Sequence, residues 1–187
     1  MKVFDDKYFD EFWSPKIKMM PQGGEYRFDQ RKYNYMLIAE HIGLGKKVFD
    51  YACGLGVLGN WLEGCDYYGC DFSQVAVDFA KDSTGGDIRK TDIIFDGAYD
   101  VICACQFIEH IENPVEWVKG ALEKAETVIC SIPNNFYKQK EHALMQWGNF
   151  DEFYELFKDI KCTRIDTPEA YHGCGQAWKA PTFEFKK

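Results

Sequence analysis

The sequence has little positive charge for its size. Its 187 residues include 22 Lys and Arg against 30 Asp and Glu, which gives a formal net charge of -8 at pH 7. A surface of this kind presents no basic field to a phosphate backbone, so nucleic acid is not the expected partner. The charge balance favours a small-molecule ligand instead.

The sequence also lacks segments that would direct it to or through a membrane. No apolar run approaches the ~20 residues that a helix needs to cross a bilayer. Acidic residues at positions 5 and 6 interrupt the start of the chain, which lacks the basic and then apolar layout of a signal peptide. We expect a cytoplasmic protein, a monomer or a homodimer, that binds no membrane.

Cysteine is common, but no pair has the C-x-x-C spacing that is typical of a zinc site. Several of the eight cysteines lie in apolar runs such as residues 101–105 (VICAC), which predicts buried, reduced thiols. An even count is also compatible with disulfides in an oxidising compartment, although a chain that can bury its own core does not need them. We expect no metal site.

The apolar content is high enough for one sizeable core. Hydrophobic residues make up 46% of the chain and aromatic residues 17%, so the chain is expected to fold, and two full domains are not expected in this length. Residues 1–45 are predicted to form an aromatic N-terminal cap and a first helix. They belong to the same domain as the predicted core, residues 46–187.

The start of this cap is rich in aromatic rings and is interrupted by Pro15 and by residues 21–24 (PQGG), which predicts irregular backbone. The rings either form a lid over a ligand or pack as a small core beneath a loop. Apolar residues at i, i+3, i+4 and i+7 then predict an amphipathic helix that ends at Gly43. These residues are Tyr35, Ile38, Ala39 and Ile42.

Short apolar strands alternate with helices through the rest of the chain, which predicts a doubly wound α/β fold with a sheet of seven mostly parallel strands. Ser73 is a predicted helix N-cap, and Asn113 with Pro114 is predicted to start another helix. Strands are predicted at residues 48–51, 66–71, 88–91, 99–105, 127–131, 161–166 and 176–185, and helices around residues 57–62, 77–80, 115–122 and 150–157.

Ligands bind at the carboxyl ends of parallel strands, and three of these strand ends carry an acid. Asp50 precedes a tight turn with Gly54 and Gly56, where missing side chains let the backbone approach a ligand closely. Asp71 follows 21 residues after Asp50, where a carboxylate can bind the two hydroxyls of a ribose. Asp92 lies a further 21 residues along, where it can accept a hydrogen bond from the amino group of an adenine.

Each of these signals has an ordinary structural explanation when it is taken alone. An acid at a strand end often caps the next helix, and a glycine turn often only joins a strand to a helix. The three acids, however, recur once per strand-helix unit in step with the turn. Together they indicate a nucleoside-type ligand.

The motifs around these acids resemble those of the class I methyltransferases that use S-adenosylmethionine. They are similar to the small-molecule branch, which includes quinone-biosynthesis O-methyltransferases. The resemblance implies a Rossmann-like methyltransferase fold with S-adenosylmethionine as cofactor. The segments that carry it are residues 48–56 (VFDYACGLG), 69–73 (GCDFS), 99–114 (YDVICACQFIEHIENP) and 128–134 (VICSIPN).

The resemblance also implies which residues hold the methionyl part of the cofactor. Asp50 and the backbone of the turn at Ala52, Gly54 and Gly56 would contact it, and the Gln106 carbonyl would face its ammonium group. Ala52 departs from the pattern, because the family more often has glycine at this position. Its methyl group narrows the approach to the cofactor without preventing it.

The remaining residues of the implied site would hold the adenosine part. Asp71 would accept hydrogen bonds from the ribose hydroxyls, and Phe72 would lie against the adenine ring. Asp92 and the backbone of Ile93 would read the adenine edge.

Methyl transfer to oxygen or nitrogen removes a proton, which requires a base unless the acceptor is already an anion. His110, soon after the fourth strand, and His142, in the polar stretch after the fifth, are the candidate bases. Glu109 and His110 can instead fix the geometry of the loop through hydrogen bonds. His142 can equally be a residue without a catalytic role.

These observations predict a methyltransferase that moves a methyl group to an oxygen atom of a small-molecule acceptor. The chain has no Asn-Pro-Pro-Tyr motif after the fourth strand, which argues against methylation of base or amide nitrogens. Two alternatives remain open at this point. One is N-methylation of a small amine or amino sugar, and the other is a cofactor-binding module without catalysis.

Overall fold

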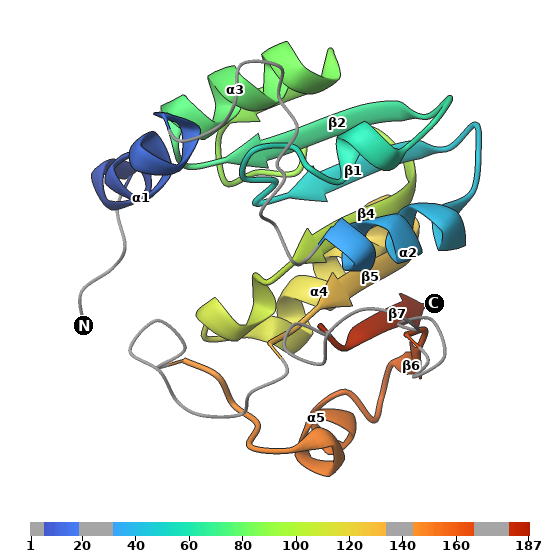
Figure 1. The fold of residues 1–187 in the computed structure, drawn as a ribbon. Helices are drawn as coiled ribbons and strands as arrows, with labels where there is room; N and C mark the ends of the chain where they lie inside the picture. The colour runs from blue at the N-terminus through green and yellow to red at the C-terminus, as the bar shows by residue number, and fades with distance from the viewer. Residues whose placement is uncertain (1–5, 19–31, 134–143, 167–179) are drawn as a thin grey trace. The chain divides into compact units, whose positions relative to one another are not determined.

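A computed structural model describes residues 6–18, 32–133, 144–166 and 180–187 (Figure 1). The chain divides into two compact units, Met1–Phe95 and Asp96–Lys187, each of which is described by itself. Its seven strands have the order β3-β2-β1-β4-β5-β7-β6, so the predicted seven-stranded α/β sheet is confirmed. The predicted division between a cap over residues 1–45 and a core over residues 46–187 stays a prediction.

The first unit is built on three parallel strands with β2 in the middle. The register pairs Asp50 of β1 with Gly69 of β2, which places the acid one position before the end of its strand. Val48, Phe49 and Ile88 are fully buried, as expected for a sheet in the interior of an α/β fold. The elements are β1 (Lys47–Tyr51), β2 (Asp66–Asp71), β3 (Asp87–Lys90), and helices α2 (Lys32–Ile42) and α3 (Gln74–Thr84).

Helix α3 begins where Ser73 was expected to cap it. The Ser73 hydroxyl accepts a hydrogen bond from the Ala76 N–H at 3.1 Å, which satisfies a donor that the first helical turn leaves without a partner. The helix ends at Gly85, whose left-handed backbone (φ 69°) closes the last turn. This part of the sequence prediction is confirmed.

The helix predicted around residues 57–62 is wrong. The structure has only a short 3-10 helix here, η1 (Gly59–Trp61), within a turn that starts after β1. Gly56 has φ +71°, which interrupts any regular helix from the turn onward. The helical spacing of apolar residues arises because Leu55, Leu58 and Leu62 are buried beneath the turn.

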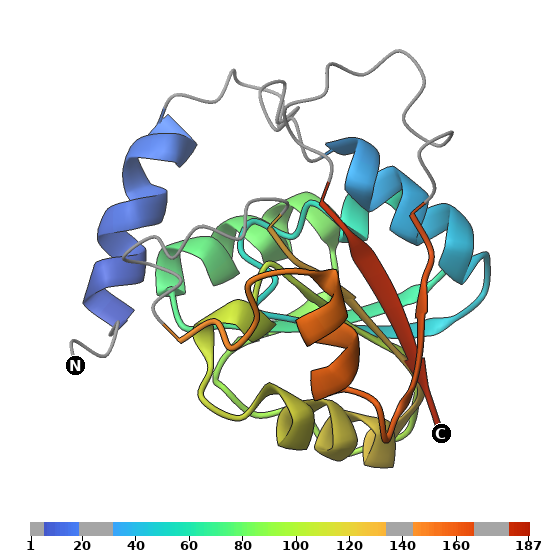
Figure 2. The same ribbon diagram turned by 90° about the horizontal axis from the view of Figure 1, so that it is seen from below.

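The irregular backbone expected at the N-terminus is also wrong for residues 6–18. They form helix α1 (Asp6–Lys18), which continues through Pro15 and packs against α3 (Figures 1 and 2). Proline lacks one backbone donor, but this loss falls in the last turns of the helix. Local contacts also support the helix, because the Lys16 ammonium lies 3.1 Å from the centre of the Phe12 ring.

The second unit contains the antiparallel part of the sheet. Strands β4 and β5 are parallel, and β7 is antiparallel to both β5 and β6, which confirms a mostly parallel sheet. Phe153 packs against Phe183 of β7 with ring centres 4.3 Å apart. The elements are β4 (Tyr99–Cys105), η2 (Ile108–His110), α4 (Pro114–Lys124), β5 (Ala125–Ser131), α5 (Phe150–Leu156), β6 (Lys161–Arg164) and β7 (Thr182–Lys186).

Helix α4 starts as the sequence predicts, with Asn113 at the N-cap and Pro114 in the first turn. The Asn113 carbonyl accepts a hydrogen bond from the Trp117 N–H at 3.0 Å. The Asn113 side chain makes no capping hydrogen bond, so the backbone position is right although the expected side-chain contact does not form.

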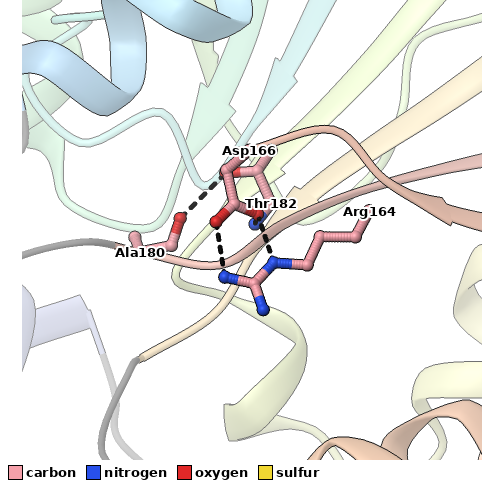
Figure 3. A network of polar contacts seen from close by, with 4 residues as sticks. All are labelled: Arg164, Asp166, Ala180 and Thr182. Carbon is pink, nitrogen blue, oxygen red and sulfur yellow. Dashed lines mark hydrogen bonds and ion pairs between the residues drawn. The ribbon is translucent and has the colours of Figure 1, made fainter. Parts of the chain in front are cut away.

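A buried carboxylate joins the end of β6 to the start of β7 (Figure 3). Both oxygens of Asp166 accept hydrogen bonds from the Arg164 guanidinium, at 2.9 and 2.7 Å. Asp166 also accepts the Thr182 N–H at 2.7 Å, and the Thr182 hydroxyl donates to the Ala180 carbonyl at 3.0 Å. This network satisfies the buried charge and holds the two strands in register.

None of the helices within the described residues is long and apolar enough to cross a membrane. The cysteines in the described part of the chain, seven of the eight, are free thiols. Cys174 lies outside the described residues.

Candidate functional site

Asp71, the last residue of β2, is the organising side chain of the first unit. It is 8% exposed, and its two oxygens accept backbone N–H groups from Gly54 and from Ser73, each at 2.9 Å. Burial raises the pKa of this carboxyl, while the backbone hydrogen bonds act in the opposite direction. Each carboxylate oxygen can accept a second hydrogen bond, so the group can still accept two donors from a ligand.

The turn after β1 brings the backbone close to this carboxylate. Gly54 and Gly56 both have a left-handed backbone, with φ of +53° and +71°. A Cβ atom on Gly56 would meet the Cβ of Ala80 at 3.0 Å, so the turn also packs tightly on α3. The predicted tight glycine turn is present, and its approach to Asp71 is a contact that the spacing alone did not show.

Ala52 has φ +55°, a conformation that residues with a Cβ atom rarely adopt. The departure from glycine noted in the sequence therefore falls where glycine would be free of strain. Strain of this kind persists only where the surrounding structure imposes it, and it is often found at functional sites.

Asp50 is buried, and one of its oxygens accepts a hydrogen bond from the Tyr67 hydroxyl at 2.7 Å. The pKa of Asp50 is raised to about 7, chiefly by burial; the Tyr67 hydrogen bond acts to lower it, and the negative charge of Asp71 acts to raise it. The buried carboxyl thus holds its proton more strongly than an exposed aspartate does. A cation bound beside it would favour the ionised form.

The third predicted acid has a different environment. The Asp92 side chain is exposed, while its backbone carbonyl accepts a hydrogen bond from the Tyr51 hydroxyl at 2.6 Å. Ile93 is also exposed, and its N–H donates to the Thr91 hydroxyl at 3.2 Å. The structure thus anchors the Asp92 backbone to the end of β1.

Phe72 follows Asp71 and is 41% exposed. The ring of Phe9 from α1 stacks nearly parallel to it, with centres 6.2 Å apart and an interplanar angle of 14°. An exposed ring beside a buried acid provides a flat apolar surface on which a planar ligand can lie.

Gln106 directly follows β4 in the second unit and has φ +56°, a second left-handed residue that is not glycine. Its N–H donates to the Ser131 carbonyl at the end of β5, at 2.8 Å. Within the described residues, the Gln106 side-chain nitrogen and the Ser131 hydroxyl are buried without a hydrogen-bond partner. Buried polar atoms of this kind often contact a ligand or water.

Glu109 and His110 lie in η2, and Glu109 is fully buried. The His110 Nε2 atom is 3.8 Å from a Glu109 oxygen, which is too long for a hydrogen bond. The His110 backbone N–H donates to the Phe107 carbonyl at 2.9 Å. The second candidate base, His142, lies outside the described residues. Both assignments stay predictions.

Within the first unit, hydrogen bonds bring Gly54 and Asp71 together, and Asp50 lies on the neighbouring strand. The sequence does not predict that Tyr67 holds Asp50, because a tyrosine near the start of a strand carries no signal of a contact 17 residues away. Nor does it predict that Asp10 contacts Ser73 over 63 residues. In the part of the chain that the structure describes, no cluster of His, Cys, Asp and Glu could hold a metal ion.

The sequence profile of the family described as "Methyltransferase domain" matches residues 24–165, which is most of the chain. No curated protein sequence matches the chain. The family match spans the glycine turn, the three predicted acids and the region around Gln106.

Several solved structures have a similar fold at low sequence identity. The plantazolicin methyltransferase BpumL, solved with S-adenosylhomocysteine (SAH) and a monoazolic desmethylPZN analogue, matches with a TM-score of 0.65 and 16% identity, over 97% of this chain and 93% of that one. Magnesium protoporphyrin IX methyltransferase from Synechocystis PCC 6803, with bound S-adenosylmethionine (SAM), gives 0.62 and 19%, over 98% and 93%. A TehB-like SAM-dependent methyltransferase from Corynebacterium glutamicum gives 0.64 and 16%, over 95% and 97%. These matches support the Rossmann-like fold.

We predict that Ala52→Gly raises the free energy of unfolding by about 0.5–1 kcal/mol, the opposite of the usual effect of this change. A left-handed backbone costs a residue with a Cβ atom ~1–2 kcal/mol, more than the ~0.5–1 kcal/mol by which glycine disfavours folding. Urea unfolding measures the difference. Ala121→Gly in α4 is the control and should lower stability by at least ~1 kcal/mol. Loss of stability in both variants would contradict strain at Ala52.

Proposed function

The chain belongs to the methyltransferase-domain family, and from this premise we propose that it transfers the methyl group of SAM to an oxygen atom of a small-molecule acceptor. Members of this kind are SAM-dependent enzymes, so the proposal concerns the acceptor and the residues that act. The observation that carries it is the Asp71 carboxylate, held by two backbone donors beside the glycine turn.

Asp71 supports the adenosine half of the proposed site. Its oxygens are held in place by Gly54 and Ser73 and can each accept one further hydrogen bond, which suits the two adjacent hydroxyls of a ribose. Phe72 offers its exposed ring to the adenine. We propose that Asp92 and the Ile93 backbone read the adenine edge, because the Tyr51 hydroxyl fixes the Asp92 backbone near the end of β1.

Asp50 supports the methionyl half of the proposed site. SAM carries a positive sulfonium and a positive ammonium group, and a buried carboxylate with a raised pKa is stabilised by a nearby cation. We propose that Asp50 and the backbone at Ala52, Gly54 and Gly56 hold this part. The Gln106 carbonyl is proposed to accept from the ammonium group, which would account for its strained backbone.

The acceptor is proposed from the relatives and from the chemistry of the reaction. BpumL and the Synechocystis enzyme are named for plantazolicin and magnesium protoporphyrin IX, which are small molecules rather than nucleic acids. The likeness of residues 99–134 to quinone-biosynthesis O-methyltransferases favours oxygen as the acceptor atom. An acidic chain with a net charge of -8 is also poorly suited to a nucleic-acid substrate.

When bound, SAM supplies a methyl group already activated by the sulfonium charge. The protein then has to align the acceptor for in-line attack, exclude water and remove a proton. We propose His142 as the base that removes the proton, and His110 as the second candidate. The His110 Nε2 atom lies 3.8 Å from an oxygen of the buried Glu109, which places a carboxyl group beside this imidazole.

We predict that Asp71→Asn weakens SAH binding by on the order of 100-fold. A hydrogen bond to a charged group contributes ~1.5–3 kcal/mol, and the amide would lose the charge and place an NH2 group where N–H donors now bind. Isothermal titration calorimetry measures the affinity. Asp78→Asn on the exposed side of α3 is the matched control and should leave the affinity unchanged. Equal affinity in both variants would show that Asp71 does not bind the ribose.

We predict that the affinity for SAM rises with pH up to about 7. Below this pH the Asp50 carboxyl, with a pKa of about 7, is protonated in the free protein, and a cation must displace that proton. The affinity should therefore fall by up to ~10-fold per pH unit between pH 7 and pH 5.5. Asp50→Asn should flatten this part of the profile. An unchanged slope in the variant would show that Asp50 does not face the bound cation.

The proposed reaction is tested by incubating the protein with methyl-labelled SAM and panels of phenols, carboxylic acids and amines. We expect labelled product only from oxygen acceptors. His142→Ala should lower kcat by ~100-fold, within the usual range for a general base, and leave SAH affinity unchanged. His41→Ala at the exposed end of α2 is the control. Transfer only to amines would contradict oxygen as the acceptor, and tight cofactor binding without any transfer would contradict catalysis.

A further inference from the structure

Helix α1 presents one face to the residues that are proposed to hold the adenosyl group. This inner face consists of Phe9, Asp10 and Trp13. Residues 9 and 13 are one helical turn apart and so point to the same side of α1. Figures 1 and 2 both show α1 beside the start of α3.

Asp10 fixes the position of this helix. Its Oδ1 atom accepts a hydrogen bond from the Ser73 hydroxyl at 2.5 Å and lies 3.3 Å from the Val75 N–H in the first turn of α3. A carboxylate is stabilised at the N-terminus of a helix because the free N–H groups there carry partial positive charge. The Asp10 contact therefore gives the Val75 N–H a hydrogen-bond acceptor and holds α1 against the start of α3.

Ser73 connects Asp10 to the proposed ribose site. Its hydroxyl donates to Asp10, and its backbone N–H donates to Asp71, which in turn accepts the Gly54 N–H. A continuous chain of hydrogen bonds thus runs from α1 to the glycine turn. A change in the position of α1 would therefore alter the hydrogen bonds of Asp71, the group that is proposed to bind the ribose.

The two aromatic rings of the inner face cover the other parts of the site. Phe9 stacks on Phe72, with an interplanar angle of 14°. The Trp13 ring lies against Gly54, because a Cβ atom built on that glycine would be 2.9 Å from the Trp13 Cζ2 atom. Phe9 and Trp13 therefore contact the two residues that flank the proposed cofactor position.

The adjacent side of α1, which carries Tyr8 and Phe12, is more exposed. Phe12 is 41% exposed, and Tyr8 is exposed to a similar extent. Lys16 lies over the Phe12 ring, as expected for an aromatic side chain at the surface. Phe12 also packs edge-on against Trp13, with ring centres 5.0 Å apart, and so supports the inner face from the side. Trp61 in η1, which is 42% exposed, provides the matched comparison for Trp13.

We propose that α1 forms one wall of the cofactor site, in which Phe9 and Trp13 contact the adenosyl group and Asp10 is the residue that positions the helix. This inference rests on the proposed cofactor placement. A purine and its ribose present a flat, largely apolar surface, and aromatic rings on that surface add stacking and exclude water. Without the Asp10 contact, α1 would move away from the site more often, and bound cofactor would dissociate faster.

Matched substitutions of two tryptophans, Trp13 and Trp61, test the wall by SAH affinity. Trp13→Leu should weaken binding by about 10-fold, or about 1.4 kcal/mol, since the leucine cannot stack on the cofactor. Trp13→Phe keeps an aromatic ring and should stay within about threefold of the parent protein. Trp61→Leu, the same change at an exposed tryptophan in η1, should have no effect. Equal losses for Trp13→Leu and Trp61→Leu would overturn the proposal.

Dissociation kinetics test Asp10 as a positioning residue. Stopped-flow measurements should show that Asp10→Asn releases SAH about 5–10-fold faster than the parent protein, while Glu11→Gln, an adjacent change at an exposed carboxylate, does not. SAH should quench the fluorescence of Trp13, and this quenching should be absent in Trp13→Phe. Such quenching would show directly that α1 contacts the bound cofactor. A purely structural role for Asp10 would lower the melting temperature and leave the dissociation rate of folded protein unchanged, and that result would refute the assignment.

These outcomes separate the wall from the cofactor assignment itself. If Asp71→Asn weakens binding while Trp13→Leu and Asp10→Asn do not, the wall is wrong and the ribose site stands. If the parent protein does not bind SAH at all, both are wrong.

Discussion

The two backbone hydrogen bonds to the Asp71 carboxylate are the interaction on which the rest of the site depends. They join three separate pieces of the first unit: the end of β2, the glycine turn after β1 and the first residue before α3. A buried carboxylate needs such donors, because an unsatisfied charge in the interior would cost several kcal/mol. The same two bonds also orient the carboxylate, so structural satisfaction and ligand recognition come from one arrangement.

The chemical character of the first unit follows from the burial of its acids and thiols. Asp50 and Asp71 both have raised pKa values because they are buried. Burial also raises the pKa of Cys53 well above its usual value and that of Cys70 to about 12, so these thiols stay neutral and are not nucleophiles. The region is thus suited to holding a cationic ligand rather than to attacking it. This agrees with a reaction in which the bound cofactor is already activated.

The sequence was a good guide to local features and a poor one to contacts across the chain. The strand at residues 99–105 and the Ser73 cap were predicted correctly, because continuous apolar runs and capping residues are local signals. The helix around residues 57–62 was wrong, since a left-handed glycine turn can bury leucines at helical spacing. Asp10 and Tyr67 could not be predicted, because their partners lie 63 and 17 residues away and are brought close only by the fold.

The most direct measurement of the central claim compares the affinity of the protein for SAH with that for its 2′-deoxy and 3′-deoxy analogues. If Asp71 binds the ribose, the parent protein should bind SAH at least ~10-fold more tightly than either analogue, and Asp71→Asn should bind all three with one affinity. Equal affinity of the parent protein for SAH and both analogues would contradict the account.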